Sequence, residues 1–399
     1  MSDAPSPAIL GRNAGSASLK FALFDRAGTD VLLRGLIDLG HAPPDLKASG
    51  PLAESLLSGP APDEGDHRAQ LAFLLDAIAS RLPQVELAAA GHRIVHGGTI
   101  FDAPQLLDID TLDQLDLLTP LAPGHQPHNL AAVRAVAASF PDLPQVGCFD
   151  TAFHRSAHPL ARRFPIPRLL HEDGLQRYGF HGLSYQHVSE MLPASAGEAA
   201  RGRVIAAHLG SGASLCAMRE LKSVATTMGL TALDGLMMGT RPGSLDPGLV
   251  LHLVRQPDAT PASVETLLGS QSGLLGVSGI SADLRVLEAS DAPEAAEAMD
   301  LFARIAARAI AGLTVDLGGL DHLIFTGGIG ENSAAMRARI VRDLGHLGAS
   351  LDEMANNSAA ERISTSESAV AIRVIRADEE GVIARATAAL LAPVEADSR

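Results

Sequence analysis

The sequence is poor in lysine, cysteine and tryptophan. Its 399 residues include lysine at three positions, two cysteines and no tryptophan. Cys148 and Cys216 cannot form a disulfide framework, and they are typical of a chain that works in a reducing compartment. No stretch of about 18 uncharged apolar residues occurs, which argues against a membrane span. The first ten residues, MSDAPSPAIL, have neither a basic region nor a long apolar run, so we expect no signal peptide.

The charge balance and the length narrow the class of protein further. The formal net charge is −15, and the lysines and arginines are scattered along the chain. This disfavours a nucleic-acid partner. A chain of 399 residues with 46% hydrophobic residues can bury two cores. We therefore expect a cytoplasmic, two-domain protein without a membrane or nucleic-acid partner.

The common nucleotide-binding motifs are also missing. The sequence has no G-x-x-x-x-G-K-[ST] and no H-R-D or D-F-G of protein kinases. One of the three lysines, Lys20, lies in the first glycine-containing segment. A protein of this composition that binds phosphates must use backbone amides, arginine and a metal ion.

The apolar pattern predicts alternating strands and helices in both halves of the chain. Strands are predicted at 18–25, 31–37, 88–96, 145–149, 203–208, 213–218, 322–326 and 371–375. Helices are predicted at 70–82, 129–140, 298–317, 333–344 and 380–391. Residues 41–66, which are rich in Pro, Gly, Ser and Asp, are predicted to be loop.

A short internal repeat links the two halves. Gly-Ser-Ala-Ser-Leu at 15–19 aligns with Ser-Gly-Ala-Ser-Leu at 211–215, and each lies before a predicted strand. Five residues are a weak match in an alanine-rich chain. Both halves, however, also repeat the order of hairpin, helix and strand. We interpret this as two related α/β halves, each with one phosphate-facing turn.

Three glycine-rich segments could supply backbone amides to phosphates. They are residues 13–18, 208–212 and 327–332. Glycine allows the backbone to approach a phosphate closely, and successive N–H groups then form an anion-binding concavity. The third segment follows a predicted strand and opens a helix, whose N-terminus attracts anions. Any one of them is equally compatible with an ordinary turn, but three in one chain favour phosphate binding.

Seven motifs in order resemble those of the acetate kinase family. They are Asn13-Ala-Gly-Ser-Ala-Ser-Leu-Lys20, Gly91-His-Arg-Ile-Val-His-Gly-Gly98, Phe149-Asp-Thr-Ala-Phe-His154, Arg177-Tyr-Gly-Phe-His-Gly182, Met237-Met-Gly-Thr-Arg241, Ser272-Gly-Leu-Leu-Gly276 and Phe325-Thr-Gly-Gly-Ile-Gly-Glu-Asn-Ser333. With the segment around Glu379 they span nearly the whole chain. The resemblance implies reversible phosphoryl transfer from ATP to acetate, giving acetyl phosphate and ADP.

The resemblance also implies a fold and an assembly. Proteins of the superfamily that includes the acetate kinase family have two duplicated actin-like (ribonuclease H-like) α/β domains that face a central cleft. The expected N-terminal domain comprises residues 1–150 plus 381–399, and the expected nucleotide-binding domain comprises 151–380. A homodimer is expected as well.

Residue roles follow from the resemblance and from the chemistry. A carboxylate attacking a γ-phosphate brings two anions together, so cations must neutralise them. Arg93 matches the family's substrate residue, and Arg241 and His181 match its transition-state stabilisers. The substrate acid is already ionised at neutral pH, so no general base is required. We therefore expect Asp150, which the family tradition also treats as a proton acceptor, to orient metal or ligands.

The remaining expected ligands are nucleotide and metal contacts. The nucleotide contacts are Lys20, His208, Leu209, Gly210, Ser211, Gly212, Asp283, Leu284, Arg285, Gly328, Ile329, Gly330, Glu331 and Asn332. Mg²⁺, or Mn²⁺ in its place, should keep several waters and therefore needs few protein ligands. By resemblance these are Asn13 and Glu379, with the adjacent Glu380 as the alternative.

Four positions depart from the family pattern. Ser211 replaces the usual Asn of the second phosphate loop, and Ala17 replaces a Ser of the first. In the expected acyl pocket, beside Val95 and Phe180, Gly124 and Ala232 replace Leu and Pro. The pocket should therefore be larger, which leaves open a preference for propionate or butyrate over acetate.

Two other classes of function compete with this interpretation. A non-catalytic or chaperone-like ATPase could have the same fold, but it would not need the carboxylate-binding motifs around Arg93 and Arg241. A metal hydrolase is suggested by the 15 histidines. His92 and His96, however, would stand roughly 13 Å apart on a strand, too far for one zinc ion. The pairs His125 with His128 and His154 with His158 lack a convergent third ligand.

Overall fold

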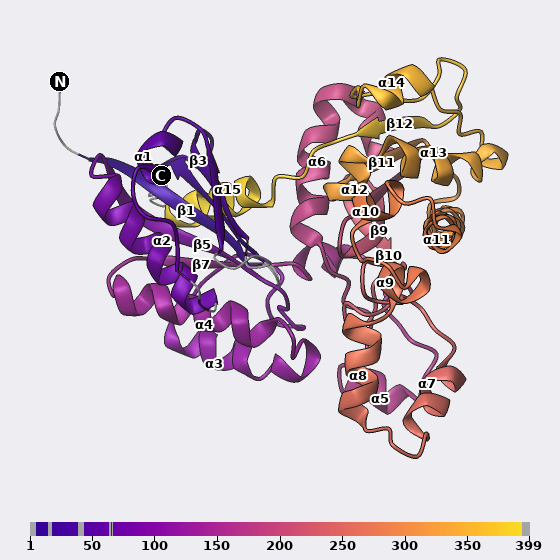
Figure 1. Ribbon diagram of the computed structural model, residues 1–399, viewed down its shortest axis with the longest axis horizontal. Coiled ribbons are helices and arrows are strands. Elements are labelled where there is room, and N and C mark those ends of the chain that lie inside the picture. Colours follow the sequence, from indigo (N-terminus) through magenta and orange to yellow (C-terminus); the bar gives the residue numbers. More distant parts are fainter. Residues whose placement is uncertain (1–4, 15–17, 39–43, 64, 66, 393–399) are drawn as a thin grey trace, which may run out of the picture. The chain divides into compact units, whose positions relative to one another are not determined.

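The chain forms two compact units (Figure 1). The computed structural model describes residues 5–14, 18–38, 44–63, 65 and 67–392. Unit 1 consists of residues 1–152 and 378–399, and unit 2 of residues 153–377. These divisions lie two and three residues from the predicted boundaries at 150 and 380. The second difference places Glu379 and Glu380 in unit 1, because the helix that they begin packs on the sheet of that unit.

Unit 1 is built on a seven-stranded sheet with the order β4-β3-β2-β1-β5-β7-β6. Its strands are β1 (Ser6–Ala14), β2 (Ser18–Asp25), β3 (Val31–Asp38), β4 (Asp45–Ser49), β5 (Val85–Ile94), β6 (Gln105–Leu106) and β7 (Gln145–Phe149). β1, β5 and β7 are parallel neighbours, while β1, β2, β3 and β4 pair antiparallel in turn. Its helical segments are α1 (Ala53–Leu57), α2 (His67–Arg81), α3 (Ile109–Asp116), η1 (Thr119–Leu121), α4 (Gln126–Ser139) and α15 (Glu379–Leu391), and η2 (Ala152–Ser156) begins at its boundary.

Alternation along β1 and β5 separates the two faces of this sheet. Leu10 and Ala90 pack in the core beneath α2 and α4, and Ile9 and Ala89 pack against α15. Successive side chains point to opposite faces, so Asn13 and Arg93 lie on the α15 face. Gly11 lies on this face too, and a Cβ there would be 3.0 Å from the Glu380 carbonyl oxygen. The absence of a side chain thus brings the start of α15 close to β1.

Unit 2 is built on a five-stranded sheet with the order β10-β9-β8-β11-β12. Its strands are β8 (Val204–Leu209), β9 (Ala213–Arg219), β10 (Lys222–Thr226), β11 (His322–Thr326) and β12 (Ala371–Val374). Its helices are α5 (Arg168–Glu172), α6 (Gly182–Ala196), η3 (Gly197–Arg201), α7 (Pro247–Val254), α8 (Pro261–Ser270), α9 (Gly273–Ser278), α10 (Leu284–Glu288), α11 (Pro293–Leu317), α12 (Gly327–Asn332), α13 (Ala334–Arg342), η4 (Gly345–Leu347) and α14 (Glu353–Asn357). α6 covers one face through Tyr185 and Val188, which pack on Val204, Ala206 and Cys216.

The two sheets share one topology. The strands β3-β2-β1-β5-β7 of unit 1 correspond in order and direction to β10-β9-β8-β11-β12 of unit 2. In each, an antiparallel three-stranded meander is followed by two parallel strands. The prediction of duplicated actin-like α/β domains is confirmed. The described residues 18–19 and 213–215 of the repeat begin the second strand of each copy.

Several elements were not predicted. β1 was missed, although it is the central strand of its sheet, and the predicted loop at 41–66 was wrong because β4 and α1 form within it. Residues 15–17 of the first glycine-rich segment lie outside the described residues. Among the described helices, none is both long and apolar enough to cross a bilayer.

Candidate active site

Three side chains meet at the carboxyl edge of the unit 1 sheet. Asn13, Arg93 and Asp150 stand at or just after the ends of the parallel neighbours β1, β5 and β7. The Asp150 amide donates to the Ile94 carbonyl at 3.0 Å, which fixes the turn after β7 beside β5. In open α/β sheets this edge is where ligands bind.

Arg93 and Asp150 form a buried ion pair. The Nε and Nη2 atoms of Arg93 donate to Oδ2 of Asp150 at 3.0 and 2.5 Å. The side chains are 13% and 1% exposed, so solvent weakens this pair little. Burial alone disfavours a charged guanidinium, but the Asp150 carboxylate outweighs it, and the pKa of Arg93 is raised. Oδ1 of Asp150 is buried and has no hydrogen-bond partner among the residues that the structure describes.

Asn13 connects this pair to the start of α15. Its Nδ2 donates to Oε2 of Glu379 at 2.6 Å, and its Oδ1 lies 3.4 Å from Nη1 of Arg93. Glu380 points elsewhere, toward Arg34, whose Nη1 is 3.9 Å from its Oε2. Of the two adjacent glutamates, Glu379 is therefore the one that the fold joins to Asn13.

The environment of Glu379 suits a bound cation. Burial raises the pKa of Glu379 to about 7; Arg93 opposes this, whereas the carboxylates of Asp150 and Glu380 add to it. A divalent cation would stabilise the ionised carboxylate. No group of three or more His, Cys, Asp or Glu side chains that could hold a metal occurs among the described residues. A cation here would therefore have few protein ligands, as Mg²⁺ prefers.

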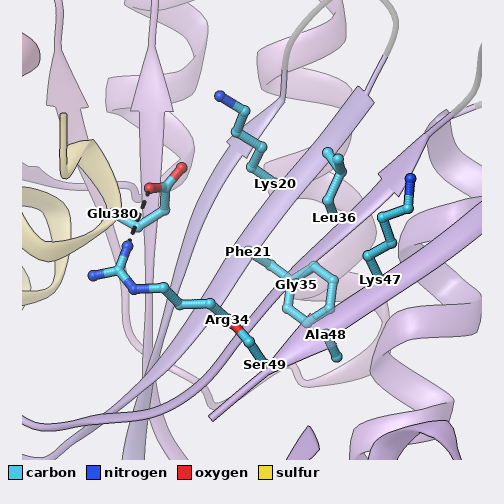
Figure 2. A pocket seen from close by; sticks show the side chains of 9 residues that line it. All are labelled: Lys20, Phe21, Arg34, Gly35, Leu36, Lys47, Ala48, Ser49 and Glu380. Atoms are coloured by element: carbon cyan, nitrogen blue, oxygen red, sulfur yellow. Dashed lines mark ion pairs between the residues drawn. The ribbon is translucent and has the colours of Figure 1, made fainter. Parts of the chain in front are cut away.

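Lys20 lies beside this cluster in a pocket of about 310 Å³ (Figure 2). Lys20 pairs with Asn13 across β1 and β2, and with Leu36 across β2 and β3, so the three side chains share a face. The pocket also contains Arg34, Lys47 and Glu380. Arg34 donates to Asp378 at 2.7 Å and Lys47 lies 3.0 Å from Asp45, so carboxylates already balance two of the cations.

In unit 2, the predicted histidines lie where α6 meets the sheet. His181 is the N-cap residue of α6 and has a left-handed backbone, with φ 58° and ψ 25°. Non-glycine residues adopt this conformation rarely, and such strain is concentrated at functional sites. The His181 ring stacks on the His208 ring with centroids 4.3 Å apart and an interplanar angle of 27°.

His181 and Arg241 converge on the second glycine-rich loop. A Cβ on Gly212 would lie 2.8 Å from Nη2 of Arg241 and 3.2 Å from Nε2 of His181. A side chain at position 212 would therefore displace the Arg241 guanidinium or crowd the His181 ring. Nη1 of Arg241 donates to the Ala232 carbonyl at 2.6 Å, which anchors the guanidinium.

The second and third glycine-rich loops are adjacent. The Gly210 amide donates to the Gly212 carbonyl at 2.9 Å, and a Cβ on Gly210 would lie 3.8 Å from the Gly328 nitrogen. A Cβ on Gly327 would clash with Leu209, at 2.8 Å from its carbonyl oxygen. The Ser211 carbonyl oxygen accepts a hydrogen bond from the Gly239 amide at 3.1 Å. This arrangement places the segment 208–212 beside the segment 328–330.

Two residues of the third loop, Glu331 and Asn332, form hydrogen bonds within unit 2. Oε1 of Glu331 accepts from the Gly327 and Ala377 amides at 3.0 and 2.9 Å, and Asn332 donates to the Gly328 carbonyl at 2.8 Å. These bonds stiffen the loop. Ile329 lies inside the same short helix, α12.

The segment predicted to contact adenosine is tied to the third loop. Asp283 caps α10 by accepting from the Arg285 amide, and Leu284 is buried beneath it. Ser333, which follows α12, donates to Glu288 at the end of α10. Asp283, Leu284 and Arg285 are therefore on an element in contact with the loop of Gly328 to Asn332.

The predicted acyl-pocket residues are divided between the units. Val95 is buried and its amide donates to Oδ1 of Asn129 at 3.0 Å, whereas Gly124 is exposed, with no atom within 4 Å of a Cβ built on it. In unit 2, the buried Phe180 lies next to His181, and Ala232 holds Arg241. The larger pocket therefore stays a prediction.

The histidine pairs considered for zinc are used differently. Nδ1 and Nε2 of His154 bond to Ser223 and to the Phe180 carbonyl, both at 2.9 Å. Burial and the neighbouring Arg12 guanidinium hold the pKa of His92 well below its ordinary value. A buried cation beside His92 also disfavours a metal ion there.

Sequence reasoning missed the serines that bond to Nδ1 of His181 and His208, and the tyrosine that bonds to one of these serines. Nδ1 of His181 bonds to Ser214, and Ser214 bonds to Tyr185; Nδ1 of His208 bonds to Ser184. Ser214 belongs to the internal repeat, and Ser184 and Tyr185 follow the Arg177–Gly182 motif within a few residues. Their place within or next to these sequence patterns is the signal that could have identified them.

Comparison with known proteins places these motifs in one family. Residues 8–385 match the model of the acetokinase family. The chain is 47% identical over 388 residues to the acetate kinase of Rhodopseudomonas palustris, covering 95% of this chain and 97% of that protein. It is 42% identical over 388 residues to the propionate kinase of Citrobacter rodentium, covering 94% and 95%. The crystal structure of a propionate kinase from Francisella tularensis superposes with a TM-score of 0.85 at 33% identity, covering 96% and 98%.

Proposed function

The chain belongs to the acetokinase family, and from this we propose that it transfers the terminal phosphoryl group of ATP reversibly to acetate, giving acetyl phosphate and ADP. The observation that carries the proposal is the match over residues 8–385 together with near-complete coverage of relatives named acetate kinase. The second candidate, a kinase that prefers propionate or butyrate, is favoured by the relative named propionate kinase and by Gly124 and Ala232.

Cations have separate tasks in this reaction. We assign the acid's carboxylate to Arg93, because a guanidinium can grip a carboxylate with two hydrogen bonds. Asp150 holds Arg93 in a fixed orientation. The acid is ionised at neutral pH, so it has no proton for Asp150 to remove. We assign the charge on the transferring phosphoryl group to Arg241 and His181, which converge at Gly212.

Nucleotide and metal binding are assigned to the loops and to α15. The amides of residues 208–212 and 328–330 would hold the phosphates, Lys20 would add a cation, and Asp283 to Arg285 would border adenosine. Mg²⁺, or Mn²⁺, would be held by Glu379 and Asn13 and would neutralise charge on the phosphate oxygens. Because Asn13 now presents Nδ2 to Glu379, binding would require its amide to turn its oxygen toward the cation.

The setting and the assembly are also part of this proposal. We propose a cytoplasmic enzyme, since both cysteines are free and buried, and burial raises the pKa of each thiol to about 12, which makes them unreactive. We propose a homodimer by analogy with the family. Sedimentation of the purified protein would test the second statement.

Formation of an acyl phosphate is the direct test of the activity. With Mg-ATP and acetate, and with hydroxylamine as the trap, the protein should yield the hydroxamate of the acid. Consumption of ATP without an acid would instead indicate an ATPase of the same fold. If a folded preparation gives no hydroxamate with any acid of two to four carbons, the assignment is wrong.

The acid preference should be broad and should depend on residue 124. We expect kcat/KM for propionate to be within about tenfold of that for acetate, because apolar walls discriminate one methylene by only about 1–3 kcal/mol. Gly124→Leu should shift the preference toward acetate by about tenfold. The backbone at Gly124 is not left-handed, and a Cβ there meets no described atom within 4 Å, so leucine adds no backbone strain and no clash at its Cβ.

Gly345→Leu is the matched control for that substitution. Gly345 also has open space around a built Cβ and no positive φ, but it is an exposed residue of η4 and is none of the predicted pocket residues. The preference of this control variant among acetate, propionate and butyrate should equal that of the natural protein. A hundredfold preference for acetate in the natural protein would contradict the larger pocket.

A further inference from the structure

The hydrogen bonds behind the two stacked histidines have only one arrangement that uses every hydroxyl proton. Tyr185 and Ser214 are both 0% exposed, so neither hydroxyl can turn to water. The Tyr185 oxygen is 2.5 Å from Oγ of Ser214, and Oγ is 2.8 Å from Nδ1 of His181. The question is which atom of each pair donates.

Tyr185 must be the first donor of this chain. Burial raises the pKa of its phenol well above the ordinary value, so the hydroxyl keeps its proton. Within the part of the chain that the structure describes, Ser214 is the acceptor that this hydroxyl reaches, because the nearby His208 backbone amide is itself a donor. If Ser214 donated to Tyr185 instead, the phenol proton would be buried without an acceptor, at a cost of about 1–3 kcal/mol.

The proton of Ser214 is then directed at His181. With one hydrogen bond accepted from Tyr185, the Ser214 hydroxyl donates to Nδ1 of His181. Nδ1 is therefore the acceptor nitrogen of a neutral ring, and the ring proton is on Nε2. Nε2 is the atom that lies 3.2 Å from a Cβ built on Gly212, on the side of the phosphate loop.

His208 has the same arrangement. Oγ of Ser184, also 0% exposed, is 2.8 Å from Nδ1 of His208. Because this is the acceptor that the structure gives the Ser184 hydroxyl within the described chain, Ser184 donates and His208 also has its proton on Nε2. Two rings stacked at 4.3 Å would repel each other if both were imidazolium, so the stack favours at least one neutral ring.

We propose that Tyr185, Ser214 and Ser184 are positioning residues that fix both stacked imidazoles in the Nε2–H form, so that each offers a neutral hydrogen-bond donor to the phosphate loop of residues 208–212. The inference deepens the proposed function, since it rests on the role assigned to His181. The alternation of strand side chains makes it possible: His208 and Ser214 are cross-strand partners on the face that α6 covers.

The physical benefit lies in preorganisation. A donor that is already oriented toward the developing charge needs no rearrangement during phosphoryl transfer. The opposite tautomer would present a lone pair to a phosphate oxygen, which is repulsive. The stack on His208 and the hydrogen bond to Ser214 hold the His181 ring in place at the left-handed N-cap, and Ser214 sets the position of its proton.

Nitrogen-15 NMR of histidine-labelled protein tests the tautomer without any enzymatic assay. His181→Asn, which tolerates the left-handed backbone, identifies the His181 signals by their loss. We expect a protonated Nε2 and an unprotonated Nδ1 in the natural protein. Ser214→Ala should give a mixture of tautomers. A protonated Nδ1 in the natural protein would overturn the proposal.

Kinetics separate positioning from simple structural support. Ser214→Ala should lower kcat by about tenfold to a hundredfold, with KM for ATP changed by less than about threefold, because the affected hydrogen bond acts on the transition state. Ser214→Thr, which keeps the hydroxyl, should recover most of the loss. A normal kcat in a folded Ser214→Ala protein, or no recovery with threonine, would refute the positioning role.

The second tyrosine provides a matched control. Tyr178 donates to the Gly174 carbonyl at 2.9 Å and belongs to the same motif, so Tyr178→Phe loses a comparable bond without touching Ser214. Tyr185→Phe should lower kcat by several-fold and Tyr178→Phe should not. Absence of hydroxamate from the natural protein would refute the proposed function while leaving the tautomer measurement interpretable.

Discussion

Replacing Arg241 by alanine should lower kcat by about two to four orders of magnitude and change KM for ATP much less, because the lost charge matters mainly in the transition state. Nη2 of Arg241 lies 2.8 Å from a Cβ built on Gly212, which directs the guanidinium at the second phosphate loop. Steady-state kinetics with saturating acid would measure both parameters.

Arg241→Lys distinguishes charge from geometry. Arg241 uses one end of its guanidinium on the Ala232 carbonyl, at 2.6 Å, and directs the other at the loop. A single ammonium cannot occupy both places, so lysine should recover only part of the lost kcat. If the alanine variant has near-normal kcat, Arg241 is structural or binds only the ground state.

The duplication was predictable because two copies preserve a local signature. Ser-Leu at 18–19 and Ala-Ser-Leu at 213–215 begin the second strand of each sheet. β1 was missed for a local reason. Its second half contains Gly11, Arg12 and Asn13, which break the apolar pattern although Arg12 is buried in the sheet.

The residues of the candidate site could be predicted from the sequence, but the contacts between them could not. Asp150 and Arg93 are 57 positions apart, and only the parallel pairing of β5 with β7 brings them together. Glu379 joins Asn13 from 366 positions away, because α15 returns to the first sheet. Tertiary pairing of this range leaves no periodic trace in a single sequence. The motif positions gave the chemistry, and the fold decided which atoms meet.

Replacing Arg93 by alanine should have two separable effects. The first is kinetic: kcat/KM for the acid should fall by about three orders of magnitude or more, because the charged group assigned to the carboxylate is gone. KM for ATP should change much less, since the loops at 208–212 and 327–332 are in unit 2, and Arg93 reaches only the expected metal ligands Asn13 and Glu379. Kinetics with varied acetate at saturating Mg-ATP would measure the loss.

The second effect is on stability. Asp150 is 1% exposed on its side chain, and without Arg93 its carboxylate would be a buried, unpaired charge. Breaking such a pair costs about 3–5 kcal/mol, which should appear as a clear fall in the midpoint of thermal or urea unfolding. Arg203→Ala is the matched control, because the Arg203–Asp321 pair is 39% and 36% exposed. Its loss should leave the unfolding midpoint nearly unchanged and should not alter kcat/KM.

The double variant Arg93→Ala with Asp150→Ala separates these effects. Removing both charges should restore much of the lost stability, because the Asp150 carboxylate is then no longer left buried and unpaired. Activity should not return, since no cation is left for the acid's carboxylate. A double variant that regains both stability and normal kcat/KM for acetate would show that Arg93 serves only to neutralise Asp150, and that another group binds the acid.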